Sequence, residues 1–292
     1  MAELVGTIRA RLDECSPAER KVARVLLAGH PAVGFETVAV IAQRAGVSGP
    51  TVLRLLDRLG FGGLPDFQQA LRRELDDRQA SPLALYAERD GGADGPAGGR
   101  VDGGGLDGGA SSLLPSAVHR TLAGLPDADL DRVVALLADR RRRVLLVGGR
   151  FSRLLAEYLH LHLVQLRDRA VLLGDDPVTR AAAVADGGRR DVLVVFDFRR
   201  YEPRLLGLAR AVKARRGAVV LVTDRWLSPV AEVADAALVS QVDSLSAYDS
   251  LVPAMAVVET VVARVLSALG DAARERMAAC EQAAQDAGLL DQ

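Results

Sequence analysis

The stretch Glu36–Phe61, ETVAVIAQRAGVSGPTVLRLLDRLGF, decides the organisation of the N-terminal part of the chain. Apolar residues recur at helical spacing on both sides of a glycine, which predicts two short amphipathic helices joined by a tight turn. Gly46 suits the left-handed backbone that ends a helix, and Ser48 suits the N-cap of the next one. The two apolar stripes are Val38, Ile41, Ala42, Ala45 and Val52, Leu55, Leu56, Leu59.

The opposite face of the second helix carries polar side chains at Thr51, Arg54 and Arg58. This pattern predicts a helix-turn-helix whose second helix enters the major groove of DNA, with Ser48 at its start and Arg44 near a phosphate. The alternative is a helical hairpin without a nucleic-acid role. Residues 1–80 hold eleven basic and ten acidic residues, so their charge supports DNA binding only weakly.

The whole chain has 292 residues, a formal net charge of −1 and 49% hydrophobic residues, which allows two domains of ordinary size. We find no uninterrupted apolar run of membrane-spanning length and no N-terminal secretory signal. Cys15 and Cys280 lack metal-ligand spacing, and their small number favours reduced thiols in the cytoplasm.

Residues 1–80 are predicted to form an all-helical domain. Ser16 and Glu19 have the spacing of a capping box at the start of one helix. Asp66 is predicted to cap another helix, Phe67–Asp77. Ten glycines within residues 91–109 then predict a flexible linker, which we place at residues 81–112.

Residues 113–292 are predicted to form an α/β domain. Leu113–Arg140 reads as helical, and strands then alternate with helices. The strands are rich in Val and Leu throughout, which indicates a parallel sheet covered by helices on both faces, with ligands at the carboxyl ends of the strands. The five predicted strands are Arg143–Gly149, Ala170–Gly174, Asp191–Phe198, Ala218–Asp224 and Ala236–Ser240.

The two halves together resemble the RpiR/MurR family of bacterial transcription regulators. The N-terminal resemblance, over about residues 3–78, rests on the motifs Ser16-Pro17-Ala18-Glu19-Arg20, Ala45-Gly46-Val47-Ser48, Thr51-Val52-x-Arg54 and Leu59-Gly60-Phe61-x-Gly63. The C-terminal resemblance, over about residues 113–270, is to the sugar isomerase (SIS) domain. It rests on the strand order, Gly148-Gly149, Thr223-Asp224 and Ser228-Pro229.

The resemblance implies a helix-turn-helix domain followed by a five-stranded SIS-like sandwich with the flavodoxin-type strand order. It implies a cytoplasmic regulator that binds operator DNA as a homodimer or homotetramer and senses a phosphorylated sugar or another anionic metabolite. The DNA-facing set would be Arg44, Ser48, Thr51, Arg54 and Arg58. The ligand-binding set would be Gly149, Arg150, Ser152, Arg199, Arg200 and Asp224.

The predicted ligand site departs from the SIS pattern. The loop after the first strand keeps one serine, Ser152, and Asp197–Glu202 replaces the serine-rich loop after the third strand. Two interpretations remain open. The three arginines replace the serines as anion donors, or they are solvated or paired with Asp175, Asp176, Asp197 and Glu202. Asp249 or Ser250 is predicted to cap the following helix.

Catalysis is not predicted, because no nucleophile–base constellation, metal-ligand set or cofactor motif is evident. Helix Ser250–Leu269 is apolar nearly all round, which predicts burial in the core or at a dimer interface. The alternative functions are a phosphosugar isomerase or nucleotide-binding enzyme with a helical appendage, and a scaffold whose sensor site is inactive.

Overall fold

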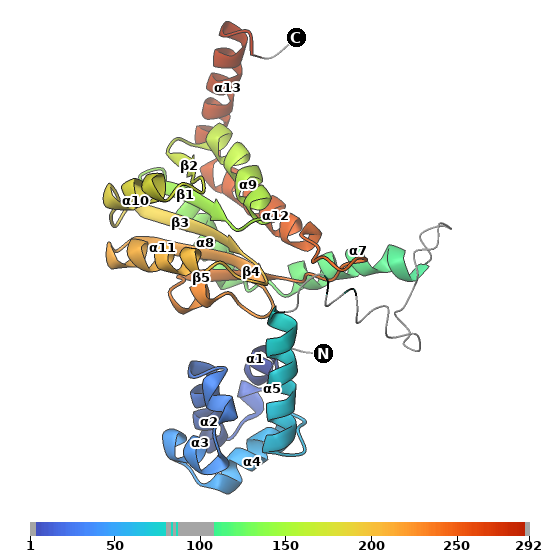
Figure 1. The fold of residues 1–292 in the computed structure, drawn as a ribbon. Helices are drawn as coiled ribbons and strands as arrows, with labels where there is room; N and C mark the ends of the chain where they lie inside the picture. The colour runs from blue at the N-terminus through green and yellow to red at the C-terminus, as the bar shows by residue number, and fades with distance from the viewer. Residues whose placement is uncertain (1–3, 80–82, 84–85, 87–107, 290–292) are drawn as a thin grey trace. The chain divides into compact units, whose positions relative to one another are not determined.

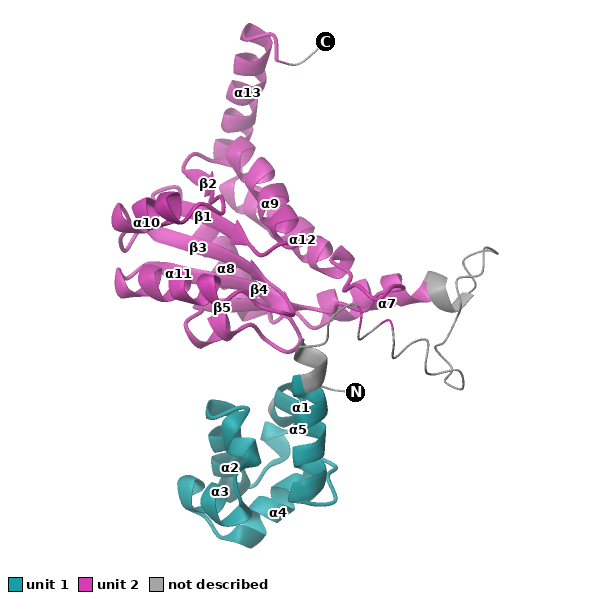
Figure 2. Ribbon diagram, in the orientation of Figure 1, with its two compact units in different colours: residues 1–80 teal, residues 81–292 magenta. Residues whose placement is uncertain are grey.

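The computed structural model describes residues 4–79, 83, 86 and 108–289. The chain divides into two compact units, residues 1–80 and 81–292 (Figure 2).

The first unit is all-helical, as predicted. Its elements are α1 (Leu4–Ala10), η1 (Leu12–Glu14), α2 (Pro17–Ala28), η2 (Ala32–Phe35), α3 (Val38–Ala45), α4 (Gly49–Arg58) and α5 (Leu64–Gln79). Helices α3 and α4 are the predicted pair, and Gly46 ends α3 in the left-handed conformation, with φ 62° and ψ 43°. A side chain at that φ is strained, which explains the glycine.

The core of this unit joins α2, α3 and α4 through their predicted stripes. Val52, Leu55 and Leu56 of α4 are at most 1% exposed, and Ile41 of α3 packs in the same cluster. Burial of such side chains contributes about 1.5–3 kcal/mol each. At the start of α2, the Glu19 amide donates to Ser16 Oγ and the Ser16 amide donates to Glu19 Oε2 at 2.8 Å, so the capping box is confirmed.

Two predicted boundaries in this region differ from the structure. Helix α5 begins at Leu64, so Asp66 lies inside its first turn rather than capping it; the Asp66 carboxylate instead accepts a hydrogen bond from the Gly62 amide. Helix α7 begins at Gly108, within the predicted linker. Residues 87–107 of that linker lie outside the described residues.

The second unit is built on a five-stranded parallel sheet of order β2-β1-β3-β4-β5, which confirms the predicted class and order. The strands are β1 (Arg143–Gly148), β2 (Ala170–Leu172), β3 (Asp191–Asp197), β4 (Ala218–Asp224) and β5 (Ala236–Ser240). Val144 of β1 pairs with Ala170 on one side and Val192 on the other, so the order reverses between β1 and β3. Ligands of such folds bind at that switch point.

Helices cover both faces of the sheet (Figure 1). Helices α8 (Asp127–Ala138), α9 (Arg153–Leu166) and α12 (Val252–Leu269) share one buried cluster with the sheet. Helix α11 (Pro203–Ala214), together with residues of α10 (Pro177–Ala185), packs in the cluster on the other face. The region predicted as helical from Leu113 to Arg140 is two helices, α7 (Gly108–Ala123) and α8, interrupted at residues 124–126.

Helix α12 is long and apolar enough, by length and composition, to cross a membrane. One face of it packs in the core through Val257, Val258 and Val261. Glu259 accepts a hydrogen bond from the Tyr158 hydroxyl, and Arg264 pairs with Asp131 at 2.8 Å. These contacts are those of a core helix. Helix α13 (Asp271–Asp286) extends from the body of the unit (Figure 1).

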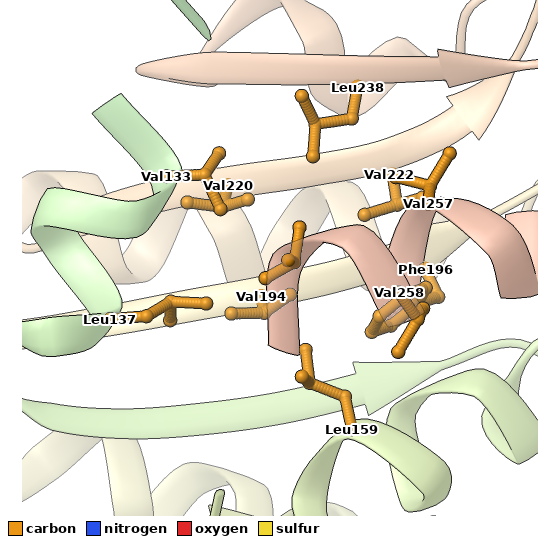
Figure 3. A pocket seen from close by; sticks show the side chains of 11 residues that line it. Val133, Leu137, Leu159, Val194, Phe196, Val220, Val222, Leu238, Val257 and Val258 are labelled. Atoms are coloured by element: carbon orange, nitrogen blue, oxygen red, sulfur yellow. The ribbon is translucent and has the colours of Figure 1, made fainter. Parts of the chain in front are cut away.

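A small void of about 10 Å³ lies between α8, α12 and the sheet (Figure 3). Its lining is entirely apolar and includes Leu137, Val194 and Val258. A void of this size and character offers no polar partner to a water molecule, so it is a packing defect rather than a binding site.

Candidate functional sites in the two units

The exposed face of α4 is centred on a stripe that differs from the predicted one. Pro50, Leu53, Arg54 and Asp57 are exposed, and they follow the i, i+3, i+4, i+7 spacing of one helix face. Leu53 is 45% exposed, although an apolar residue would be assigned to the core on composition alone. The helical spacing could have identified Pro50, Leu53 and Asp57 from the sequence.

Thr51 does not belong to that exposed face, and the prediction that it points outward is wrong. Its side chain is buried, with 4% exposure, because it is adjacent to Val52 in sequence and lies one helical turn, four positions, before Leu55 on the packed side of α4. Its hydroxyl lies 3.1 Å from Ser48 Oγ and accepts a hydrogen bond from Arg54 Nη2, also at 3.1 Å. Thr51 therefore supports two exposed neighbours.

Ser48 occupies the N-cap position of α4, but its side chain makes no capping hydrogen bond. Arg44 and Arg58 are exposed and each lies beside a carboxylate. Arg44 Nη2 is 2.6 Å from Glu36, and Arg58 Nε is 3.4 Å from the buried carboxylate of Glu19. Arg54, which donates a hydrogen bond to the neutral hydroxyl of Thr51, carries the least compensated positive charge of the predicted DNA-facing set.

In the second unit a cavity of about 170 Å³ lies at the carboxyl ends of β1 and β3, at the switch point of the sheet. Five of the six predicted ligand-binding residues line it. Its lining also includes acidic and aromatic side chains that the sequence did not assign to the site. The lining residues are Gly149, Arg150, Phe151, Ser152, Asp197, Phe198, Arg199, Arg200, Glu202, Tyr248, Asp249 and Leu251.

Asp224, the sixth predicted ligand residue, is fully buried and lies behind the cavity, so the prediction of direct contact is wrong. Its carboxylate accepts hydrogen bonds from the Arg199 amide, the Tyr201 hydroxyl at 2.6 Å and the Trp226 amide at 3.0 Å. Asp224 thus fixes the backbone and a side chain of the loop that follows β3.

The hydroxyl of Ser152 is committed to the protein framework. Ser152 Oγ donates to the Phe196 carbonyl at 2.7 Å and accepts from the Gly149 amide at 2.9 Å. A hydroxyl has one proton to donate. In this arrangement Ser152 ties the β1 loop to β3 and its own proton is not available to an anion in the cavity.

Arg199 is the most enclosed of the three arginines, with 8% of its side chain exposed. Its guanidinium makes two hydrogen bonds to the carboxylate of Asp249, one of them from Nε to Oδ2 at 2.9 Å. The same guanidinium stacks over the Trp226 ring, 4.8 Å from its centroid. Asp249 or Ser250 was predicted to cap the following helix; Asp249 instead pairs with Arg199, while the Ser250 hydroxyl accepts a hydrogen bond from the Val252 amide at the helix start at 3.2 Å.

Arg150 and Arg200 are exposed at the rim of the cavity and make no ion pair within the described residues. The predicted partners Asp175 and Asp176 are used elsewhere, by Arg180 at 2.9 Å and by the start of α10. Phe151 and Tyr248 meet edge to face at 6.4 Å across the same rim. The cavity therefore combines two open cations with aromatic surface.

Two buried carboxylates adjoin the cavity: Asp197 belongs to its lining and Asp224 lies behind it. Burial raises the pKa of Asp197 to about 6, against hydrogen bonds from Ser228 and the Glu202 amide. Burial likewise raises the pKa of Asp224 to about 6, against hydrogen bonds from Tyr201, Arg199 and Trp226. No cluster of three potential metal ligands occurs among residues 4–79 and 108–289.

Comparison with known families assigns both units. The helix-turn-helix domain of the rpiR family matches residues 2–78, and the SIS domain matches residues 136–264. The chain belongs to the RpiR family. The fold and domain order implied by the sequence resemblance are confirmed.

Curated relatives share parts of this RpiR-family chain. It is 38% identical over 91 residues to the HTH-type transcriptional regulator HexR of Pseudomonas aeruginosa, covering 31% of this chain and 32% of HexR. It is 30% identical over 232 residues to the bifunctional protein glk of Paraburkholderia xenovorans, covering 79% of this chain and 34% of that protein. The matches thus span about a third of the length of these relatives.

Solved structures share the fold. The sugar isomerase domain of the RpiR transcription factor from Sphaerobacter thermophilus superposes with a TM-score of 0.55 and 22% identity, over 58% of this chain and 94% of that one. The NanR protein of Vibrio vulnificus, solved with ManNAc-6P, superposes with a TM-score of 0.52 and 17% identity, over 99% and 100% of the two chains.

Proposed function

We propose that this RpiR-family protein is a transcription regulator that binds operator DNA through α4 and senses a small anionic metabolite in its SIS domain. The observation that carries the proposal is the rpiR-type helix-turn-helix with Arg54 exposed on its second helix. An arginine on that face can form a bidentate pair with guanine in the major groove. Arg44, Ser48 and Arg58 flank it and would contact phosphates.

The sensor half of the proposal rests on the cavity at the carboxyl ends of β1 and β3. Arg150 and Arg200 at the rim, with Arg199 in the wall, suit a ligand that carries an oxyanion. Carboxylates on the wall, such as Glu202, suit hydroxyl groups, because they accept hydrogen bonds. The NanR structure, with ManNAc-6P bound, has the same fold. A phosphorylated sugar or a related anion, controlling genes of carbohydrate metabolism, is the ligand class that we propose.

The DNA half is tested by selection. The purified full chain is incubated with fragmented genomic DNA from its own organism, and the retained fragments are sequenced and titrated by fluorescence anisotropy. We expect a shared, two-fold symmetric sequence, because symmetric dimers read symmetric operators. Retention of fragments with no common sequence would contradict the proposal.

We also propose that the protein works as a homodimer or homotetramer, in the cytoplasm. Support comes from large apolar side chains exposed along α9 and the adjoining α12, namely Leu154 at 62%, Leu161 at 55%, Val252 at 51% and Leu266 at 40% exposure. Several large apolar side chains exposed on two neighbouring helices suit an association surface. Analytical ultracentrifugation of the wild type and of Leu161→Asp tests this, with dissociation expected in the variant.

An isomerase is the second candidate, because Glu202 lines the cavity and a carboxylate can serve as a base. The cavity lining contains no histidine among its twelve residues, and the exposed face of α4 has no role in an isomerase. Incubation with phosphorylated sugars in deuterated water, followed by NMR, separates the candidates. Deuterium incorporation into a sugar C–H would favour the enzyme.

A further inference from the structure

The Arg199–Asp249 pair closes one wall of the cavity from two distant parts of the chain. Arg199 follows β3, and Asp249 belongs to segment 241–251, the irregular stretch between β5 and α12. The pair is 50 positions apart in sequence and bidentate, and both side chains line the cavity. A carboxylate of the protein therefore already occupies the guanidinium geometry that suits an external oxyanion.

Resting on the proposed sensor function, we propose that the ligand binds by exchange: its oxyanion takes the place of the Asp249 carboxylate on Arg199. Asp249 is thus an internal competitor that sets the affinity of the cavity. Its release frees segment 241–251 from the wall. The ligand class is a small metabolite that carries a carboxylate or a phosphate, together with hydroxyl groups for the remaining acidic wall.

Three features support exchange over simple addition beside the pair. Arg199 is held from behind, because its amide donates to buried Asp224 and its guanidinium stacks on Trp226. Asp249 lies on a segment without regular secondary structure. Within that segment, the Ser250 amide donates a hydrogen bond to the Val242 carbonyl at 3.1 Å. The arginine is therefore held by the framework around β3 and β4, whereas the carboxylate lies on an irregular segment.

The remaining donors point to the same outcome. The Ser152 hydroxyl donates to the Phe196 carbonyl, so it does not supply the cavity with a proton. Arg150 and Arg200 stand at the exposed rim. An oxyanion that enters between them reaches a third, enclosed cation only at Arg199. Binding there gains two charge-assisted hydrogen bonds in a position shielded from solvent.

The test compares Asp249→Asn with Asp175→Asn in the full chain. Each removes one carboxylate that pairs with an arginine of the second unit, but only the first removes the partner of Arg199 in the cavity wall. Titrations with inorganic phosphate, glucose 6-phosphate and gluconate follow Trp226 fluorescence, a specific reporter because Trp226 is the chain's single tryptophan and touches Arg199. The phosphate and carboxylate compounds distinguish the two sources of oxyanion.

We expect Asp249→Asn to bind at least one of these compounds about tenfold more tightly than the wild type, and Asp175→Asn to differ from the wild type by less than about threefold. If both variants gained affinity equally, the gain would be explained by the loss of one negative charge, and exchange would be overturned. Weaker binding by Asp249→Asn, or binding of none of the three compounds by that variant, would also overturn it.

Hydrogen exchange on the wild-type protein supplies a measurement that does not depend on the folding of a variant. With saturating ligand, segment 241–251 should take up deuterium faster while the loop at residues 149–152 is protected. Protection of both would overturn exchange and yet leave the proposed sensor function standing. Loss of DNA binding bears on the proposed regulator and not on exchange.

Discussion

Arg54 on α4 and Arg199 after β3 are the same residue in opposite situations. Arg54 is exposed and bonds to the neutral hydroxyl of Thr51. Arg199 is 8% exposed, paired with a carboxylate and stacked on an indole ring. In the proposed DNA complex, the first guanidinium would meet a base or a phosphate after giving up water and its hydrogen bond to Thr51. The second meets an anion after its internal partner has left.

The difference shows how one side chain can serve two kinds of recognition. An exposed arginine gives fast, salt-dependent contact along a DNA backbone or groove. An arginine neutralised by its own protein resists weak anions and selects those able to displace the carboxylate. The positive charge of an arginine alone does not define it as a binding residue. The free energy of anion binding also depends on the group that the arginine contacts before the anion arrives.

If the two units unfold independently, Leu56→Ala should lower the stability of the helical unit alone, and this is the largest effect that we expect. Leu56 is 1% exposed in the core of the helical unit. Truncation should lower the stability of that unit by about 2–5 kcal/mol. Calorimetry should show one transition at a lower temperature and the SIS-domain transition unchanged. Leu146→Ala in β1, which is also fully buried, should move only the other transition; shifts of both transitions in either variant would contradict independence.

Arg54→Ala measures how much the exposed arginine of α4 contributes to DNA affinity. Loss of a bidentate base contact costs about 1–3 kcal/mol, which is roughly a 5- to 150-fold loss of affinity for the selected operator. Anisotropy titrations at constant salt measure it. The matched control is Arg24→Ala, because Arg24 is an exposed arginine on α2 of the same unit. If both variants lose affinity equally, Arg54 contributes only charge.

The buried carboxylates that adjoin the cavity predict a pH dependence confined to the SIS domain. Burial raises the pKa of Asp197 and of Asp224 to about 6, above the ordinary 3.8. Between those values the folded state binds protons that the unfolded state has lost, so stability rises as the pH falls from about 7 to 5. We expect a gain of about 1–2 kcal/mol. Thermal unfolding of the wild type and of Asp197→Asn measures it, with a shallower slope in the variant. A loss of stability as the pH is lowered from about 7 to 5 would contradict the raised pKa values of Asp197 and Asp224.

The smallest expected effects separate two serines at helix starts in the same unit. Ser16 makes both hydrogen bonds of a capping box, whereas Ser48 makes no capping bond. Ser16→Ala should destabilise the helical unit by about 1 kcal/mol, and Ser48→Ala by only a few tenths. Urea unfolding followed by circular dichroism compares them. Equal losses would show that Ser48 stabilises α4 through its contact with Thr51.

The fold could be predicted from the sequence because local patterns determine it. The Val- and Leu-rich strands give a buried parallel sheet, and β4 and β5 occupy the ranges predicted for them. Gly46 ends α3 and the Ser16–Glu19 capping box begins α2. Both signals depend only on residues that are close in sequence. The helix boundaries at Leu64 and Gly108 were missed, since good capping residues inside a helix and glycines at its start mislead local arguments.

The site was predicted less completely, because its contacts join distant segments. The topology placed the predicted site at the carboxyl ends of β1 and β3, where Arg150 and Arg199 line a cavity. The pairing of Arg199 with Asp249 bridges 50 positions and leaves no periodic signal. Thr51 was misplaced by one helical step, and Asp224 was assigned to the surface although it ends a fully buried strand.

Segment 241–251 is attached to more than the cavity. Asp243 pairs with Arg120 at 2.9 Å, and the Gln241 amide donates to the Thr121 hydroxyl at 2.9 Å, so the segment is fastened to α7. Helix α7 is where the chain enters the SIS domain after the glycine-rich stretch. A displacement of Asp249 can thus be transmitted to α7 through the Asp243–Arg120 pair and the Gln241–Thr121 hydrogen bond, without a change in the sheet. Regulation would then reach α7 through Asp243 and Gln241.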